Sequence, residues 1–198
     1  MKGQSWNPKG LTSIWTLLTR PSLALKREGI KAICFDKDNT LTAPYSVDIH
    51  PPFKAAWKEC IDTFGSEQVV IVSNSAGSNN DVGYAEATRI QESLKIHVIR
   101  HAEKKPGGAQ DLLNHFPSLQ PSQIAVVGDR LLTDIVYGNK MGAFTILTTK
   151  IITEEGDNRF ALHLRRFENR ILVPFLNTLG VKPPSHFLTS IHSLIRKQ

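Results

Sequence analysis

Short apolar segments alternate with longer segments of helical spacing along most of this 198-residue chain, and this alternation limits the fold more than any other feature. Strands that alternate with helices form parallel sheets whose two faces are both covered. We therefore predict an α/β fold, a three-layer Rossmann-like parallel sheet with helices on both faces. The expected strands cover residues 30–36, 68–73, 96–101, 124–128 and 144–149, and the expected helices cover 51–64, 79–94, 107–116 and 133–141.

Polar residues follow four of these strands, at the edge where open parallel sheets bind ligands. In chain order they are Asp36 and Asp38, then Ser73, then Lys105, then Asp129 with Asp134. On an extended chain the Asp36 and Asp38 carboxylates share one face, and Lys37 is expected on the other. An Asp-x-Asp turn alone more often caps a helix or closes an Asx-turn. The prediction of a site therefore depends on all four elements and their order.

The four elements resemble the motifs of the haloacid dehalogenase-like phosphohydrolases, across residues 30–148. These motifs are Asp-x-Asp-x-Thr, a strand-terminal Ser or Thr, a Lys that often precedes Pro, and Gly-Asp-x4-Asp. The resemblance implies that Asp36 attacks phosphorus and forms an aspartyl-phosphate. It makes Asp38 the general acid and then the general base. Ser73 would donate to a phosphoryl oxygen, and Lys105, rather than the adjacent Lys104, would offset negative charge.

The same resemblance implies a magnesium site. Its ligands would be Asp36, the main-chain carbonyl of Asp38, and Asp129, with Asp134 binding directly or through water. An all-oxygen set suits this cation. Asn39 and Thr40 are expected to shape the loop around it.

Signatures of other chemistries are absent from the sequence. Neither Cys34 nor Cys60 begins a Cys-x5-Arg phosphatase loop, and there is no phosphate-binding Gly-x4-Gly-Lys loop or dinucleotide fingerprint. His97 and His101 are four apart on an expected strand, which makes a zinc pair improbable. Two isolated cysteines indicate no disulfide framework.

The spacing of the motifs leaves no room for a folded cap domain. Residues 40–68 hold a loop and one helix, and residues 73–104 hold one helix and one strand. An open site suits a phosphate on something large, which could be a protein, a nucleic acid end or a lipid headgroup. We expect a basic amphipathic segment at 1–29, a phosphatase core at 30–150, and a basic amphipathic helical extension at 151–198.

Charge is distributed unevenly along the chain. Residues 1–27 contain five basic residues and no acidic one, and residues 159–198 contain seven basic residues and one acidic one, although the net charge is only +6. Such basic ends favour contact with an anionic surface. Both ends also have apolar stripes at helical spacing, which suit either a bilayer interface or the protein's own core. The stripes are Leu11, Ile14, Trp15 and Leu18, and then Phe160, Leu164, Phe167 and Ile171, the latter beside Arg159, His163, Arg166 and Arg170.

Residues 35–45, 71–77 and 128–134 resemble the mitochondrial phosphatidylglycerophosphate phosphatases, and Lys37 inside Asp-Lys-Asp-Asn-Thr is the most distinctive match. This resemblance implies a phospholipid substrate, whose terminal phosphate is removed to give phosphatidylglycerol for cardiolipin synthesis. It implies peripheral attachment to an anionic membrane surface, on the matrix side of the mitochondrial inner membrane. No nucleic acid and no protein partner is expected. Asn74 is expected to bind substrate, and Lys37 and Arg130 are further candidates for headgroup contacts.

Two alternatives remain open at this point. One is a capless phosphatase that acts on a nucleic-acid or protein phosphate. The other is a non-catalytic scaffold with the same fold.

Overall fold

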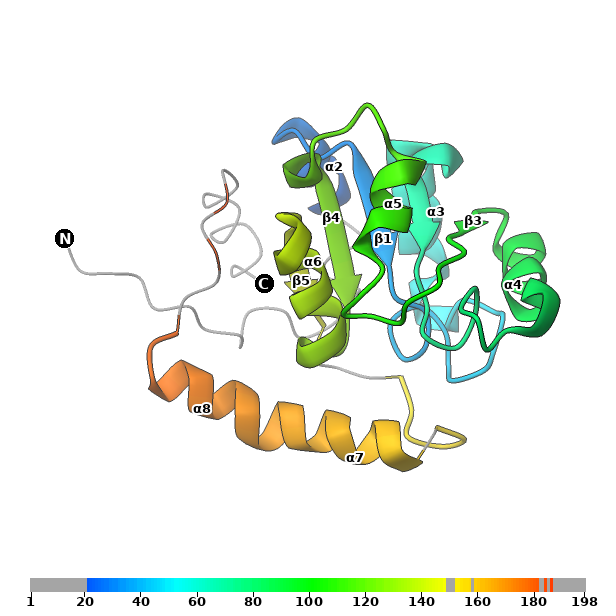
Figure 1. The fold of residues 1–198 in the computed structure, drawn as a ribbon. Coiled ribbons are helices and arrows are strands. Elements are labelled where there is room, and N and C mark those ends of the chain that lie inside the picture. Colours follow the sequence, from blue (N-terminus) through cyan, green and yellow to red (C-terminus); the bar gives the residue numbers. More distant parts are fainter. Residues whose placement is uncertain (1–20, 149–151, 158, 182–183, 185, 187–198) are drawn as a thin grey trace.

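A five-stranded parallel sheet forms the centre of the protein in the computed structural model, which describes residues 21–148, 152–157, 159–181, 184 and 186 (Figure 1). The strand order is β3-β2-β1-β4-β5, and β1 pairs in parallel with both β2 and β4. This arrangement confirms the predicted three-layer α/β fold. The strands are β1 (Ala32–Phe35), β2 (Val69–Ile71), β3 (His97–Val98), β4 (Ile124–Gly128) and β5 (Phe144–Leu147).

Two hydrophobic cores cover the two faces of the sheet. On β1, Ile33 and Phe35 join the core on one face, whereas Ala32 and Cys34 join the other, as the alternation of strand side chains requires. The first face is covered by α2 (Pro21–Arg27), α3 (Lys54–Phe64) and α4 (Ala85–Leu94). The second is covered by α5 (Ala109–His115) and α6 (Val136–Met141). Because both faces are covered, every residue of β1, β2 and β4 is buried.

Several predicted boundaries were wrong, each for a local reason. The strand expected at 96–101 has only two residues, because the chain then turns and His101 N donates to Gly77 O instead of continuing the ladder. The helix expected from residue 79 begins at Ala85, after a 3-10 turn η4 (Val82–Tyr84) in which Gly83 and Tyr84 have positive φ. The helix expected at 133–141 is divided into a π-helical turn η6 (Leu131–Ile135) and α6.

No additional domain lies over the carboxyl ends of the strands in the described stretches where one could be inserted. Between β1 and α3 there is a loop with two isolated bridges and one 3-10 turn, η2 (Pro51–Phe53). Between β2 and β3 there are only η4 and α4. The prediction that no cap covers this edge is confirmed for these stretches. Two further 3-10 turns, η3 (Ser66–Gln68) and η5 (Pro121–Gln123), precede β2 and β4.

The described part of the C-terminal extension forms a helical rod near the carboxyl ends of the strands (Figure 1). It consists of α7 (Arg159–Phe167), a π-helical turn η7 (Glu168–Leu172) and α8 (Val173–Thr178). Val173 packs with residues of η6 and β5 in a small third core. Glu168 is fully buried and accepts a hydrogen bond of 2.8 Å from Leu131 N. The inner face of the rod is therefore attached to the carboxyl-terminal edge of the sheet.

The outer face of the rod is apolar and exposed. Four large apolar side chains, spaced four residues apart, are 46 to 60% exposed: Phe167, Ile171, Phe175 and Leu179. Two of them belong to the stripe that the sequence predicts, so in the described residues this part of the stripe does not pack on the core. The stripe at Leu11–Leu18 and the side chain of Phe160 lie outside the described part of the chain. The domain boundaries at residues 29 and 150 stay predictions.

Candidate active site

The register of three neighbouring strands brings the predicted site residues to one level. Asp36 N donates to Val127 O at 2.8 Å, and Val72 N donates to Phe35 O at 3.0 Å. Strands β1, β2 and β4 therefore end side by side. Because Asp36, Ser73 and Asp129 each follow these ends within two residues, the fold gathers residues that are far apart in the sequence.

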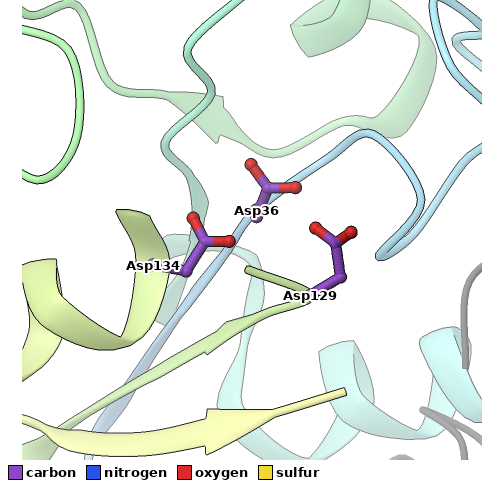
Figure 2. A group of neighbouring side chains, drawn as sticks. All are labelled: Asp36, Asp129 and Asp134. Carbon is purple, nitrogen blue, oxygen red and sulfur yellow. The ribbon is translucent and has the colours of Figure 1, made fainter. Parts of the chain in front are cut away.

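Three carboxylates lie close together at this edge (Figure 2): Asp36 directly follows β1, Asp129 directly follows β4, and Asp134 belongs to η6. One oxygen atom of each lies within 4.8 Å of those of the other two. The close approach requires glycine at position 128, because a Cβ there would clash with the Asp134 side chain. Arg130 N, at the start of the π-helical turn, donates to Asp134 Oδ2 at 3.1 Å and fixes its orientation.

The trio has the chemistry of a divalent-cation site. Asp129 Oδ1 is buried and has no hydrogen-bond partner among the described residues, and such an atom is costly unless something binds it. Carboxylate oxygens are the ligands that hard cations such as Mg²⁺ prefer. The residues therefore fit the predicted cation. That Asp38 contributes its main-chain carbonyl stays a prediction.

Lys105 is the counter-charge of this site. Its Nζ lies 2.7 Å from Asp36 Oδ1 and 2.6 Å from Asp134 Oδ1, and it donates to Val72 O at 2.7 Å. Burial disfavours its charged form, but the two carboxylates outweigh burial and raise the pKa of the ammonium. The adjacent Lys104 is exposed, so Lys105 alone of the two reaches the trio.

Asn74 holds the backbone of Lys105. Its Oδ1 accepts from Lys105 N at 2.8 Å, and its Nδ2 donates to Lys105 O at 3.2 Å. Both ends of the amide are thus engaged in positioning the lysine. A contact between Asn74 and substrate stays a prediction.

Burial makes the charged forms of Asp36 and Asp129 less favourable and so raises their pKa values. It raises the pKa of Asp36 to about 6, against the lowering effect of Lys105. It also raises the pKa of Asp129 well above its ordinary value, although Arg165 acts in the opposite direction. Carboxylates crowded in this way are typical of sites whose charge is balanced by a cation.

Asp38 lies beside the trio with a separate set of partners. Its Oδ1 accepts from Tyr45 N at 2.9 Å and from Lys37 Nζ, and its Oδ2 accepts from Ser75 Oγ at 2.7 Å. Ser75 Oγ is in turn 2.9 Å from Ser73 Oγ. Ser75 was not among the residues predicted for the site, although a second hydroxyl two residues after Ser73 was a usable signal.

The expectation that Lys37 points away from the carboxylates was wrong. Strand β1 ends at Phe35, and the chain then turns, with Thr40, Leu41 and Thr42 all donating to Lys37 O. Strand alternation therefore no longer applies, and the side chain folds back to Asp38. Lys37 is 1% exposed, which leaves no room for a headgroup contact.

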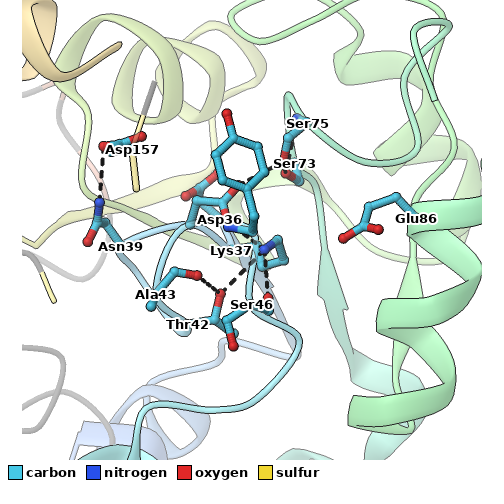
Figure 3. Close-up of polar contacts among 12 residues, drawn as sticks. Asp36, Lys37, Asn39, Thr42, Ala43, Ser46, Ser73, Ser75, Glu86 and Asp157 are labelled. Atoms are coloured by element: carbon cyan, nitrogen blue, oxygen red, sulfur yellow. Dashed lines mark hydrogen bonds and ion pairs between the residues drawn. The ribbon is translucent and has the colours of Figure 1, made fainter. Parts of the chain in front are cut away.

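The C-terminal extension also reaches the trio, which no sequence pattern indicated. Arg165 Nε of α7 donates to Asp129 Oδ2, and Arg165 Nη1 donates to Asp157 Oδ2. Asn39 Nδ2 also donates to Asp157 Oδ2, at 3.2 Å (Figure 3). Asn39 Oδ1 accepts the N–H groups of residues 152 and 153, so this side chain joins the loop after β1 to the segment before α7. In the sequence nothing distinguishes Arg165 from its neighbour Arg166.

A separate hollow of about 450 Å³ lies at the opposite edge of the sheet. It is lined by residues near the amino ends of β2 and β3, among them Glu67, Lys95 and His97. Because ligands of open parallel sheets bind at the carboxyl ends of the strands, we assign the chemistry to the trio rather than to this hollow.

Comparison with known proteins shows which family the chain resembles in sequence. The family model described as mitochondrial PGP phosphatase matches residues 9–153. Phosphatidylglycerophosphate phosphatase 1, chloroplastic/mitochondrial, of Arabidopsis thaliana is 41% identical over 168 residues, which are 84% of this chain and 47% of that protein. Phosphatidylglycerophosphate phosphatase 1, chloroplastic, of Chlamydomonas reinhardtii is 40% identical over 167 residues, which are 83% of this chain and 61% of that protein.

A bacterial protein is also similar. Probable phosphatase YqeG of Bacillus subtilis is 34% identical over 149 residues, which are 75% of this chain and 80% of that protein. The chain spans about half of the Arabidopsis relative's length and about three fifths of the Chlamydomonas relative's length. All four predicted motifs lie within the residues that the family model matches, and the chain therefore belongs to the mitochondrial PGP phosphatase family.

Proposed function

We propose that this chain hydrolyses the terminal phosphate of phosphatidylglycerophosphate and releases phosphatidylglycerol, a precursor of cardiolipin, and inorganic phosphate. The observation that carries the proposal is the convergence of Asp36, Asp129 and Asp134 with Lys105 at the sheet edge. Family membership supports the identity of the substrate, because the Arabidopsis and Chlamydomonas relatives are both named for this activity.

The proposed reaction has two steps, both carried out by side chains of this edge. A carboxylate oxygen of Asp36 forms a bond to phosphorus as the bond to the lipid oxygen breaks, and Asp38 gives that oxygen its proton. Asp38 then removes a proton from water, whose oxygen attacks phosphorus and frees Asp36. Lys105 and the Ser73 hydroxyl stabilise negative charge on the phosphoryl group.

A magnesium ion held by Asp36, Asp129 and Asp134, with the main-chain carbonyl of Asp38, would offset the charge of the phosphate and of the crowded carboxylates. Lys105 keeps Asp36 and Asp134 from repelling each other, and Arg165 keeps one oxygen of Asp129 engaged while the other remains available. Lys105 and Arg165 thus offset part of the negative charge of the three carboxylates, and the bound ion would offset more of it.

The outer face of the C-terminal rod is our candidate for the membrane contact. The exposed apolar residues of this face lie on the same rod as two exposed arginines, Arg159 and Arg170. Apolar side chains beside arginines suit the interface of an anionic bilayer, where each cation near the surface contributes about 1 kcal/mol. We propose peripheral attachment at the matrix side of the mitochondrial inner membrane; the family description carries the word mitochondrial, which supports the organelle. Among the described residues, no helix is both long and apolar enough to cross a bilayer.

The proposed membrane contact predicts that Ile171→Ser with Phe175→Ser weakens binding to vesicles that contain cardiolipin or phosphatidylglycerol. Both side chains are more than half exposed, so the changes remove apolar area from the surface and not from the core. Flotation with vesicles measures binding, and hydrolysis of soluble p-nitrophenyl phosphate is the control for an intact site. Unchanged flotation of the double variant would contradict the role of this face.

The proposed activity is tested by phosphate release from phosphatidylglycerophosphate in mixed micelles, with Mg²⁺ or with EDTA. Parallel assays use p-nitrophenyl phosphate and a 3′-phosphorylated oligonucleotide. We expect turnover that requires Mg²⁺ and strongly favours the lipid. Preference for the oligonucleotide would support the nucleic-acid alternative, and no release from any ester would support a non-catalytic scaffold.

A further inference from the structure

Lys37 is a buried lysine whose ammonium group has an oxygen partner for each of its three N–H bonds. Its Nζ lies 2.5 Å from Asp38 Oδ1. It also lies 2.9 Å from Ser46 O and 3.4 Å from Thr42 Oγ1 (Figure 3). The side chain is 1% exposed, so water does not compete for these contacts. A buried ammonium is expensive unless it is paired and hydrogen-bonded, and here it is both.

The contacts of Lys37 restrict what Asp38 can do. Oδ1 of Asp38 accepts two N–H groups, from Lys37 Nζ and Tyr45 N, and both of these groups can only donate. Oδ2 has a different partner, the Ser75 hydroxyl, which can donate or accept and can turn to Ser73 Oγ instead. A proton on the Asp38 carboxyl is therefore excluded from Oδ1 and finds room on Oδ2.

We propose that Lys37 is a positioning residue that aims the Asp38 carboxyl, with its proton on Oδ2, at the leaving oxygen of the substrate. This inference rests on the proposed function. As Asp36 forms its bond to phosphorus, the bond to the alkyl oxygen breaks and the Oδ2 proton moves to that oxygen, which leaves as the alcohol. Lys37 itself transfers no proton in this step.

The departing group provides a readout for this role. An alkoxide such as that of the glycerol headgroup is strongly basic and must be protonated as it leaves, whereas p-nitrophenolate leaves without a proton. General acid catalysis typically contributes about 10²–10⁴-fold where it is needed. A defect in aiming Asp38 therefore slows the alkyl ester far more than the aryl ester, whereas general damage to the site slows both.

The test measures kcat/KM, which includes the step in which the leaving group departs, for two soluble esters with Mg²⁺. They are p-nitrophenyl phosphate and dihexanoyl phosphatidylglycerophosphate below its micellar concentration. We expect Lys37→Met to lower the value for the lipid by about 100-fold, and that for the aryl ester by less than about tenfold. Asp38→Asn should show the same selectivity. The exposed Lys104 provides the matched control, and Lys104→Met should leave both values unchanged.

The double variant Lys37→Met/Asp38→Asn separates positioning from general support of the loop. If Lys37 acts through Asp38, the double variant is no slower on the lipid than Asp38→Asn alone. Equal losses on the two esters, or losses that multiply in the double variant, would overturn the inference. If Lys37→Met does not fold, Lys37→Gln, which keeps N–H donors without the charge, allows the same comparison. A wild-type chain that hydrolyses neither ester would overturn the proposed function, and this inference with it.

Discussion

Replacing Asp36 with Asn should reduce phosphate release from phosphatidylglycerophosphate by a factor on the order of 10⁴ or more. A neutral amide cannot serve as the nucleophile, so the aspartyl-phosphate cannot form. The change also removes one of the three carboxylates that would hold the cation. The measurement is phosphate release under single-turnover conditions, with enzyme in excess over lipid and Mg²⁺ present.

The loss in Asp36→Asn should not come from unfolding. Burial of the Asp36 charge and its repulsion by Asp134 outweigh the attraction of Lys105, so removing this charge should not lower Tm in EDTA. Lys105 keeps its ion pair with Asp134 in this variant. Asp48 lies exposed in the same loop, and Asp48→Asn is the matched control that should keep full activity. If Asp36→Asn had activity near that of the wild type, the assignment of Asp36 as the nucleophile would be wrong.

The second large effect is expected from Arg165→Met, and it concerns stability. The guanidinium lies between the buried carboxylates of Asp129 and Asp157, with side-chain exposures of 5%, 1% and 7%. Removing one partner of a buried ion pair typically costs about 3–5 kcal/mol, because the carboxylates lose their positive partner while they stay buried. For a chain of this length that corresponds to a fall in Tm of roughly 6–20 °C. Thermal unfolding in EDTA measures it.

Arg166 is the matched control for this prediction. It neighbours Arg165 on α7, but its partner is Glu154 and both side chains are about 40% exposed. Water and salt weaken such a pair, so Arg166→Met should change Tm little. Addition of Mg²⁺ should restore part of the stability lost in Arg165→Met, since a cation on the trio replaces part of the missing positive charge. Equal shifts for the two variants would show that burial of the Arg165 pair is unimportant.

The part of the fold that sequence could predict is the part governed by local periodicity. Buried strands such as Ala32–Phe35 are apolar throughout because both faces of a parallel sheet are covered, and such runs are easily recognised. The carboxyl ends of parallel strands meet at one edge, so Asp36, Ser73 and Asp129 could be grouped from the strands alone. In the structure, Phe35 pairs with both Ile71 and Val127, and this pairing sets the register of the three strand ends.

The rest depends on tertiary contacts that local patterns do not determine. Arg165 reaches Asp129, and pairs with Asp157 as well, because the rod packs against η6 and β5. The side chain of Lys37 does not point in the predicted direction, because strand β1 ends at the residue before Asp36. Beyond that point, strand alternation no longer determines which way a side chain points. The C-terminal stripe was ambiguous, since a lipid surface and a protein core favour the same residues.

The most direct test of the account is whether phosphate from the lipid becomes bound to Asp36. Wild-type protein is mixed with phosphatidylglycerophosphate labelled with ³²P in the terminal phosphate, and samples are quenched in acid from the first turnover onward. If Asp36 is the nucleophile, we expect Mg²⁺-dependent, hydroxylamine-labile phosphate on the peptide that contains Asp36, and none on the corresponding peptide of Asp36→Asn. Rapid hydrolysis of the lipid with no protein-bound phosphate above the Asp36→Asn background at any time would contradict this assignment.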